Sequence, residues 1–230
     1  MKFSGSRRVL LAFVLLLFVI ASVYGGKTAT LPMKSKDWVV DAFDASGDGT
    51  SYSPGALPHN GGVYFYFPVD SGGITRLLYR YAKPYANHNV PITGSSFTAT
   101  FEVVTTGNPI FNYMLEPSNT CVNPAHVRFY MDRQRWWEPP YPPTYRWWSN
   151  PVAFELAGTS STMQLTVPLD PAQWMSVYGV YGNDALADFQ GTLDDSFEIG
   201  FSFGGGCYLG HGVNGSGGTA TFVLSNFTIG

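Results

Sequence analysis

Strict alternation of apolar and polar residues in five short runs constrains the fold of this chain more than any other feature. Residues 97–103, FTATFEV, place an apolar side chain at every second position, with threonine or glutamate between. Period two is typical of antiparallel strands that bury one face and leave the other polar. The five runs lie at residues 63–67, 97–103, 126–131, 162–167 and 196–203.

Further apolar runs predict more strands, at residues 38–43, 74–81, 110–115, 152–156 and 219–229. In the last of these the apolar phase changes between Leu224 and Phe227, which predicts a β-bulge near Asn226. The chain contains 26 glycines and 16 prolines, which separate the runs. We therefore expect an all-β fold, an antiparallel two-sheet β-sandwich of jelly-roll type.

Helix is predicted at one or two short connections only. At residues 170–179, Asp170 can cap free N–H groups, Pro171 suits the first helical position and Gly179 can end the helix. Residues 183–193 form a second, weaker candidate. Both are expected to connect strands of the sandwich.

The amino terminus has the layout of a secretory signal. Lys2, Arg7 and Arg8 precede an apolar run at residues 9–24, and two glycines follow. This pattern predicts a signal peptide at residues 1–25 and a single β-sandwich domain at residues 26–230. The alternative is an uncleaved anchor, although the run is shorter than the ~20 residues that span a bilayer. Either way we expect an exported protein, secreted or held in the cell envelope.

The charge of the chain argues against nucleic acid as a partner. Without the three basic residues of the signal, 10 Lys and Arg remain against 16 Asp and Glu, a net charge of about −6. Phosphate binding depends mainly on positive charge. A membrane is expected as a partner only through an uncleaved amino-terminal segment, and the sequence does not predict an oligomeric state.

Two cysteines, Cys121 and Cys207, are expected to form a disulfide in an exported chain. The alternative is a pair of buried free thiols.

Four of the six tryptophans lie in RWWEPPYPPTYRWWSN, residues 135–150. If the two RWW arms pair as an antiparallel hairpin around a loop at residues 138–145, Trp136 lies opposite Trp147. One face of the hairpin then holds Trp136 and Trp147, which can fill the core. The other face holds Arg135, Trp137, Arg146 and Trp148, because neighbouring residues of a strand point to opposite sides.

This second face has the composition of a sugar-binding platform, since indole rings stack on pyranose C–H groups and arginines bind hydroxyls. The predicted ligand-binding residues are Arg135, Trp137, Tyr141, Tyr145, Arg146 and Trp148. Two structural alternatives remain open: the arginines stack on the tryptophans as cation–π pairs, or the prolines pack on the indoles and close the loop.

The sequence DASGDG places Asp44, Ser46 and Asp48 at alternate positions, as in the first half of a calcium loop. The twelfth position is Gly55 instead of glutamate, so a polar turn is the alternative. A structural calcium ion is the only cofactor that the sequence suggests.

No catalytic residue is predicted. The chain has no H-E-x-x-H, and its G-x-G-x-x-G at residues 210–215 precedes a β pattern instead of the helix that a dinucleotide site requires. A glycosidase needs two facing carboxyl groups about 5–10 Å apart. The glutamates and aspartates are spread over many strands and loops, so spacing alone selects no pair.

Four stretches of the second half are distinctive: NPIFNYMLEPSNTC (108–121), YRWWSNPVAFEL (145–156), LTVPLDPAQWMSVYG (165–179) and FSFGGGCYLGHGVNGSGGTATFVLSNFTI (201–229). On these stretches the chain, from about residue 96 to 229, resembles a family of uncharacterised exported bacterial β-sandwich proteins. The resemblance implies export and a sandwich fold, and it implies no activity.

The sequence thus favours a non-catalytic extracellular carbohydrate-binding protein, with a polysaccharide or other glycan as its partner. Two alternatives stay open. One is a glycan-active enzyme, a hydrolase or lyase on a jelly-roll scaffold, and the other is a structural or assembly protein of the cell envelope.

Overall fold

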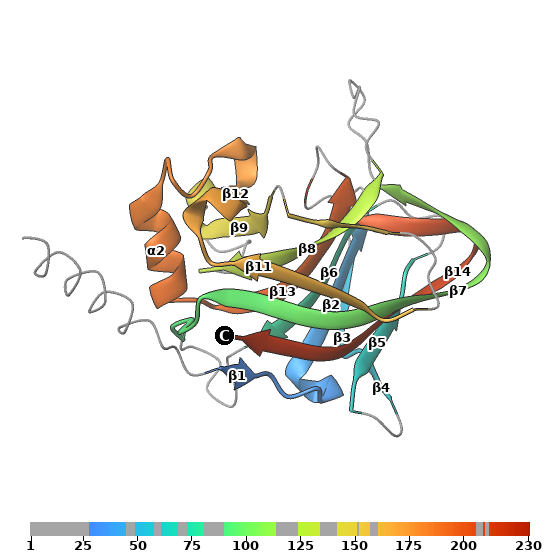
Figure 1. The fold of residues 1–230 in the computed structure, drawn as a ribbon. Coiled ribbons are helices and arrows are strands. Elements are labelled where there is room, and N and C mark those ends of the chain that lie inside the picture. Colours follow the sequence, from blue (N-terminus) through green and yellow to red (C-terminus); the bar gives the residue numbers. More distant parts are fainter. Residues whose placement is uncertain are drawn as a thin grey trace, which may run out of the picture.

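The computed structural model describes residues 28–44, 49–57, 61–68, 73–80, 90–113, 124–133, 142–150, 152–156, 161–205, 209 and 212–230. Two antiparallel sheets pack against each other, as Figure 1 shows. The prediction of an all-β, two-sheet sandwich is confirmed. Among the described residues, no helix is both long and apolar enough to cross a membrane.

The smaller sheet is built on two long strands, β7 (Ser96–Tyr113) and β14 (Val213–Ile229), which pair along most of their length. Its strand order is β11 (Met163–Pro168), β7, β14, β5 (Val63–Tyr66) and β4 (Gly55–Ala56), and β1 (Ala29–Thr30) also pairs with β14.

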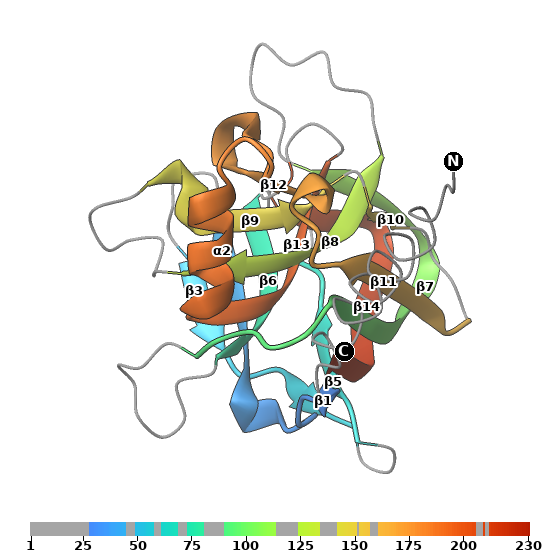
Figure 2. The ribbon, with the colours of Figure 1, turned by 60° about the vertical axis from the view of Figure 1, so that its left-hand side comes forward.

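The larger sheet carries the candidate site. Its strand order is β12 (Trp174–Ser176), β9 (Arg146–Ser149), β8 (Ala125–Asp132), β13 (Glu198–Gly205), β6 (Gly73–Arg80), β2 (Trp38–Asp44) and β3 (Gly49–Tyr52), and β10 (Phe154–Glu155) pairs with β8. The helix α2 (Leu186–Asp194) lies beside β9 at one end of the sandwich (Figures 1 and 2). Short 3₁₀ turns span Ser35–Asp37, Pro143–Tyr145, Pro171–Gln173 and Val177–Gly179.

Aromatic rings fill the space between the two sheets. The rings of Phe101 and Phe222 stack with their centroids 5.1 Å apart, and those of Phe129 and Phe201 stack at 5.2 Å. Each such pair contributes about 0.5–1.5 kcal/mol beyond the area it buries. The apolar positions of the alternating runs supply these rings, so the alternation decides which face of each strand joins the core.

Strand β14 contains the bulge that the phase change predicts, with a register shift between Leu224 and Asn226. A second shift lies between Ser216 and Gly218. There Gly217 and, on the facing strand, Gly107 adopt positive φ angles of 74° and 77°. This irregular pairing lets β7 continue through Gly107, so the strands predicted at residues 97–103 and 110–115 are one strand.

Of the two predicted helices, one forms. Residues 183–193 contain most of α2, whereas residues 170–179 form two 3₁₀ turns with the strand β12 between them. The predicted cap is present, because the Asp170 carboxylate accepts a hydrogen bond from the Ala172 N–H at 3.0 Å. The helix ends after one turn because Trp174 enters the core and its strand pairs with β9.

Candidate functional site

The second RWW arm forms β9, but its partner is not the first arm. Strand β9 pairs with β8 on one side, where Met131 faces Trp147 and Tyr130 faces Trp148, and with β12 on the other side. Both edges of β9 are therefore occupied, and the predicted pairing of Trp136 with Trp147 is wrong. Strand β8 extends its own alternating pattern to Asp132, and its last three residues, Tyr130 to Asp132, pair with Trp148 to Arg146.

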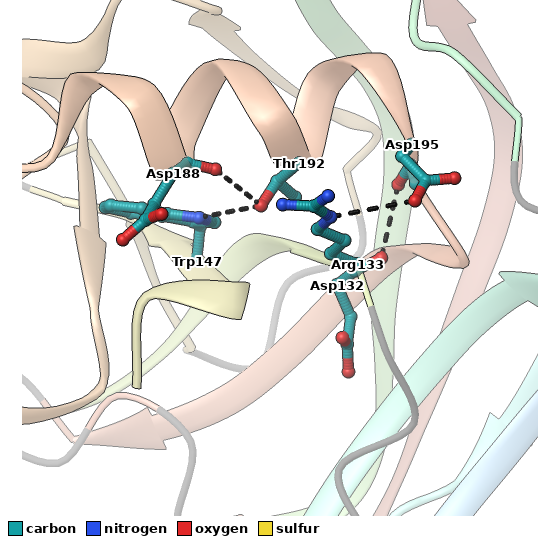
Figure 3. A network of polar contacts seen from close by, with 7 residues as sticks. Asp132, Arg133, Trp147, Asp188, Thr192 and Asp195 are labelled. Atoms are coloured by element: carbon teal, nitrogen blue, oxygen red, sulfur yellow. Dashed lines mark hydrogen bonds and ion pairs between the residues drawn. The ribbon is translucent and has the colours of Figure 1, made fainter. Parts of the chain in front are cut away.

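Trp147 points into the core, as the hairpin hypothesis expected for this residue. Its side chain is 0% exposed, and its ring meets that of Phe189 on α2 edge-on at 5.3 Å. Figure 3 shows the indole pointing toward α2, where its N–H donates to the Thr192 hydroxyl at 3.1 Å. Thr192 in turn donates to the Asp188 carbonyl at 3.0 Å. Trp147 therefore fixes α2 to the larger sheet and has no exposed surface for a ligand.

Trp148 lies on the opposite face of the larger sheet, away from the core. Its ring packs on Tyr130 with centroids 5.4 Å apart, and Val39 and Leu209 complete this second apolar cluster. The ring is only 7% exposed, so the expectation that it lies open to water is wrong. The indole N–H is buried and has no hydrogen-bond partner among the described residues.

Of the other predicted binding residues, the structure describes two, Tyr145 and Arg146. Tyr145 and Arg146 are half-buried, and the guanidinium of Arg133 lies over the Tyr145 ring at 4.9 Å. This cation–π pair involves neither the arginines nor the tryptophans of the predicted platform, so the alternative of arginines stacked on the tryptophans stays open. The residues Arg135, Trp137 and Tyr141 lie outside the described part of the chain.

The metal and disulfide predictions also fall outside the described residues. Ser46, Asp48, Cys121 and Cys207 are not described, and for Asp44, the last residue of β2, only the backbone is. The calcium site and the disulfide therefore stay predictions. Within the described ranges, no group of three or more His, Cys, Asp or Glu side chains is placed to hold a metal ion.

The face of the larger sheet that carries Trp148 holds an unusual set of buried polar residues, here named the outer-face cluster. Its members come from β2, β6, β8, β9 and β13 and alternate with the core residues of those strands. They are Asp41, Arg76, Arg128, Tyr130, Asp132, Trp148, Glu198 and Ser202, all buried.

Arg76 lies at the centre of the cluster, between Asp41 and Tyr130. Its guanidinium is 3.8 Å from the Asp41 carboxylate and 5.6 Å from the centroid of the Tyr130 ring. Burial alone would lower the pKa of Arg76, yet the acidic groups around it, led by Tyr130 and Asp41, raise it above its ordinary value. Gly200 lies on β13, the strand between β6 and β8, and pairs with Leu78 on one side and Tyr130 on the other. Because glycine adds no side chain there, Arg76 reaches across β13 to the ring.

Tyr130 and Asp132 form an acid–tyrosine pair. The phenol donates to the Asp132 carboxylate at 2.8 Å. Burial raises the pKa of Tyr130 well above its ordinary value, and the negative charge of Asp132 raises it further. Tyr130 therefore keeps its proton and acts as a donor, not as a base. Glu198 lies directly opposite Asp132 on the neighbouring strand, so two buried carboxylates share this face.

Arg128 and Ser202 face each other across β8 and β13. The Arg128 side chain donates to the Gly205 carbonyl at 3.3 Å, while its Nε and the Ser202 hydroxyl are buried without a partner among the described residues. Burial lowers the pKa of Arg128 to about 10, so it remains a cation at neutral pH. His126 lies on the same face two residues earlier, and burial lowers its pKa as well.

The sequence contained a signal for this cluster. Alternation already assigns Arg128 and Tyr130 to one face of their strand and Glu198 and Ser202 to one face of theirs. A solvated polar face is the ordinary interpretation of that pattern, and the buried state of these side chains depends on what packs over them. Arg76 and Asp41 lie in runs of mixed polarity, where the pairing of strands is needed to place them.

Comparison with models of known protein families finds no match, and no curated protein matches the chain.

Proposed function

We propose that this protein binds glycans, and that its ligand site lies on the outer-face cluster instead of on a hairpin of exposed indoles. The observation that carries the proposal is the buried indole N–H of Trp148, which has no acceptor among the described residues. Leaving such a donor unsatisfied costs about 1–3 kcal/mol. A sugar hydroxyl placed at this nitrogen would remove that cost.

The neighbours of Trp148 support a saccharide as the ligand. Tyr130 packs beside the indole, and Arg128 lies two residues earlier on the same face of β8. Aromatic surface and the buried N–H donors of Trp148 and Arg128 therefore lie together. Binding sites for small polar ligands typically combine apolar walls with a few oriented polar groups. Leu209 belongs to the same buried apolar cluster as this aromatic pair, and in this proposal the ligand reaches Trp148 by displacing the Leu209 side chain.

A glycan array with the purified protein tests the proposal. We expect binding to at least one glycan class, and weaker binding by Trp148→Phe, which keeps an aromatic ring and lacks the N–H donor. Leu209→Ala should bind more tightly, because it removes the side chain that covers the ring. If the wild-type protein retains no glycan of any class, the proposal is wrong.

One observation favours a glycan hydrolase as a second candidate. Asp132 and Glu198 are directly opposite across two antiparallel strands. Such residues have Cβ atoms about 4.5–5.5 Å apart, and retaining glycosidases use two carboxyl groups about 5–5.5 Å apart. The raised pKa of Tyr130 disfavours a lyase with this tyrosine as base. Release of reducing ends from a bound glycan, abolished in Glu198→Gln, would establish the hydrolase; unchanged glycan after prolonged incubation would exclude it.

A further inference from the structure

Arg128 is a buried cation without an acidic partner in the described part of the chain. It is 3% exposed, and the single side-chain hydrogen bond it makes there goes to the backbone carbonyl of Gly205. Burial is the cause of its lowered pKa. An uncompensated charge inside a protein is strongly unfavourable unless an opposite charge accompanies it. The position of Arg128 therefore calls for an anion.

Two other arginines show how this chain neutralises a guanidinium when no ligand is needed. Arg76 lies 3.8 Å from the Asp41 carboxylate on the same face. Arg133, the next arginine of the chain after Arg128, lies 3.6 Å from Asp195 and is partly exposed (Figure 3). Arg128 is more buried than Arg133, and among the described residues no carboxylate pairs with it.

Ser202 extends the donor set beside Arg128. It is paired with Arg128 on one side and with Arg76 on the other, so its hydroxyl lies in a row between two guanidinium groups. The hydroxyl is fully buried and has no hydrogen-bond partner among the described residues. A serine hydroxyl and an arginine Nε offer two donors to one acceptor group, and arginine binds carboxylates with a geometry that its planar fork favours.

We propose that Arg128 and Ser202 bind the carboxylate of an acidic sugar, an inference that rests on the proposed glycan-binding function. Trp148 lies diagonally from Arg128 across β8 and β9, since it faces Tyr130 two residues further on. Diagonal neighbours on a sheet are about 7–8 Å apart. One uronic acid residue spans that distance, with its ring at the indole and its carboxylate at Arg128.

The test compares matched ligands that differ only in charge. Trisaccharides of galacturonate, glucuronate and mannuronate are titrated calorimetrically into the purified protein, each beside the same trisaccharide after reduction of its carboxyl groups to alcohols, with sodium acetate at equal ionic strength as a third arm. We expect one uronate to bind at least about tenfold more tightly than its reduced form, and Arg128→Gln to remove most of that preference. Arg133→Gln, at the position just after β8 and outside the cluster, should keep it.

The outcomes separate this inference from the proposed function. If a reduced trisaccharide binds as tightly as its uronate, the carboxylate inference is overturned and glycan binding stands. If acetate binds as tightly as the uronate, the sugar is not recognised and the inference of an acidic sugar is overturned. If none of these trisaccharides binds, the inference of an acidic sugar is overturned, and the glycan array decides whether the protein binds another class of glycan. Should Arg128→Gln fail to fold, Ser202→Ala must still reduce the preference for the uronate, and an unchanged preference contradicts the proposal.

Discussion

Trp147 and Trp148 are neighbours in one strand, so the same substitution at each position tests whether the buried N–H of Trp148 is truly unsatisfied. Replacement by phenylalanine removes roughly 1 kcal/mol of apolar burial at either position. Trp147→Phe also loses the 3.1 Å hydrogen bond to Thr192, worth about 1 kcal/mol. Thr192 still donates to Asp188, so no buried donor is left without a partner. The expected destabilisation is about 2 kcal/mol.

Trp148→Phe gives a different balance. The lost burial again costs roughly 1 kcal/mol, but the variant also removes an unsatisfied buried N–H, which costs the wild type about 1–3 kcal/mol. The net change lies between about zero and 2 kcal/mol of added stability. For a chain of this size about 1 kcal/mol shifts Tm by about 2–4 °C. Scanning calorimetry should therefore show a Tm about 4–8 °C lower for Trp147→Phe and an unchanged or higher Tm for Trp148→Phe.

Trp174→Phe provides a second hydrogen-bonded control, because the Trp174 N–H donates to the Pro168 carbonyl at 2.8 Å. It should lose stability as Trp147→Phe does. If all three variants lose the same amount, the Trp148 N–H is satisfied in the free protein, and the argument that this nitrogen awaits a ligand acceptor fails.

Three further predictions concern the outer-face cluster and its surroundings. Gly200→Ala should lower the free energy of unfolding in urea by about 1–3 kcal/mol, because φ at this residue is 155°. The new methyl group would also enter the space between Arg76 and Tyr130. An unchanged urea midpoint would contradict this packing. Burial lowers the pKa of His126, so the folded state binds the proton of this imidazole less readily than the unfolded state does. The free energy of unfolding should therefore fall as the pH drops below about 6.5. His126→Asn should weaken that pH dependence, and identical pH profiles for the variant and the wild type would contradict the prediction. Asp170→Ala should cost about 0.5–2 kcal/mol of unfolding free energy through loss of the cap, whereas Asp170→Asn should retain most of it; equal losses in the two variants would exclude a capping role.

The sequence predicts the strands well because their signal is local. Period-two alternation follows from backbone geometry, so residues 162–167 and 196–203 identify a strand and its buried face without knowledge of its neighbours. The bulge near Asn226 is visible for the same reason, since an extra residue must change the phase.

Strand partners could not be predicted in this way. The two RWW arms look like the halves of a hairpin, but pairing is decided by the whole sheet, and β8 competes successfully for β9. The same competition overrides the helix expected at residues 170–179, where a cap and a proline favour a helix and burial of Trp174 favours a strand. The candidate site depends on both choices, because the pairing of β8 with β9 and β13 brings Trp148, Arg128 and Ser202 to one face.

The pairing of β14 with β1, β5 and β7 also has a consequence for how fast the chain reaches its native state. Ala29 is paired with Ile229, and Phe97 with that same residue from the other side, so the ladder joins segments more than a hundred positions apart. Proteins dominated by such distant contacts fold in milliseconds to seconds, because the entropy of closing large loops is lost before the contacts form. Until β14 docks, β7 presents a long unpaired edge with exposed phenylalanines, and refolding yields should therefore fall steeply as the protein concentration rises.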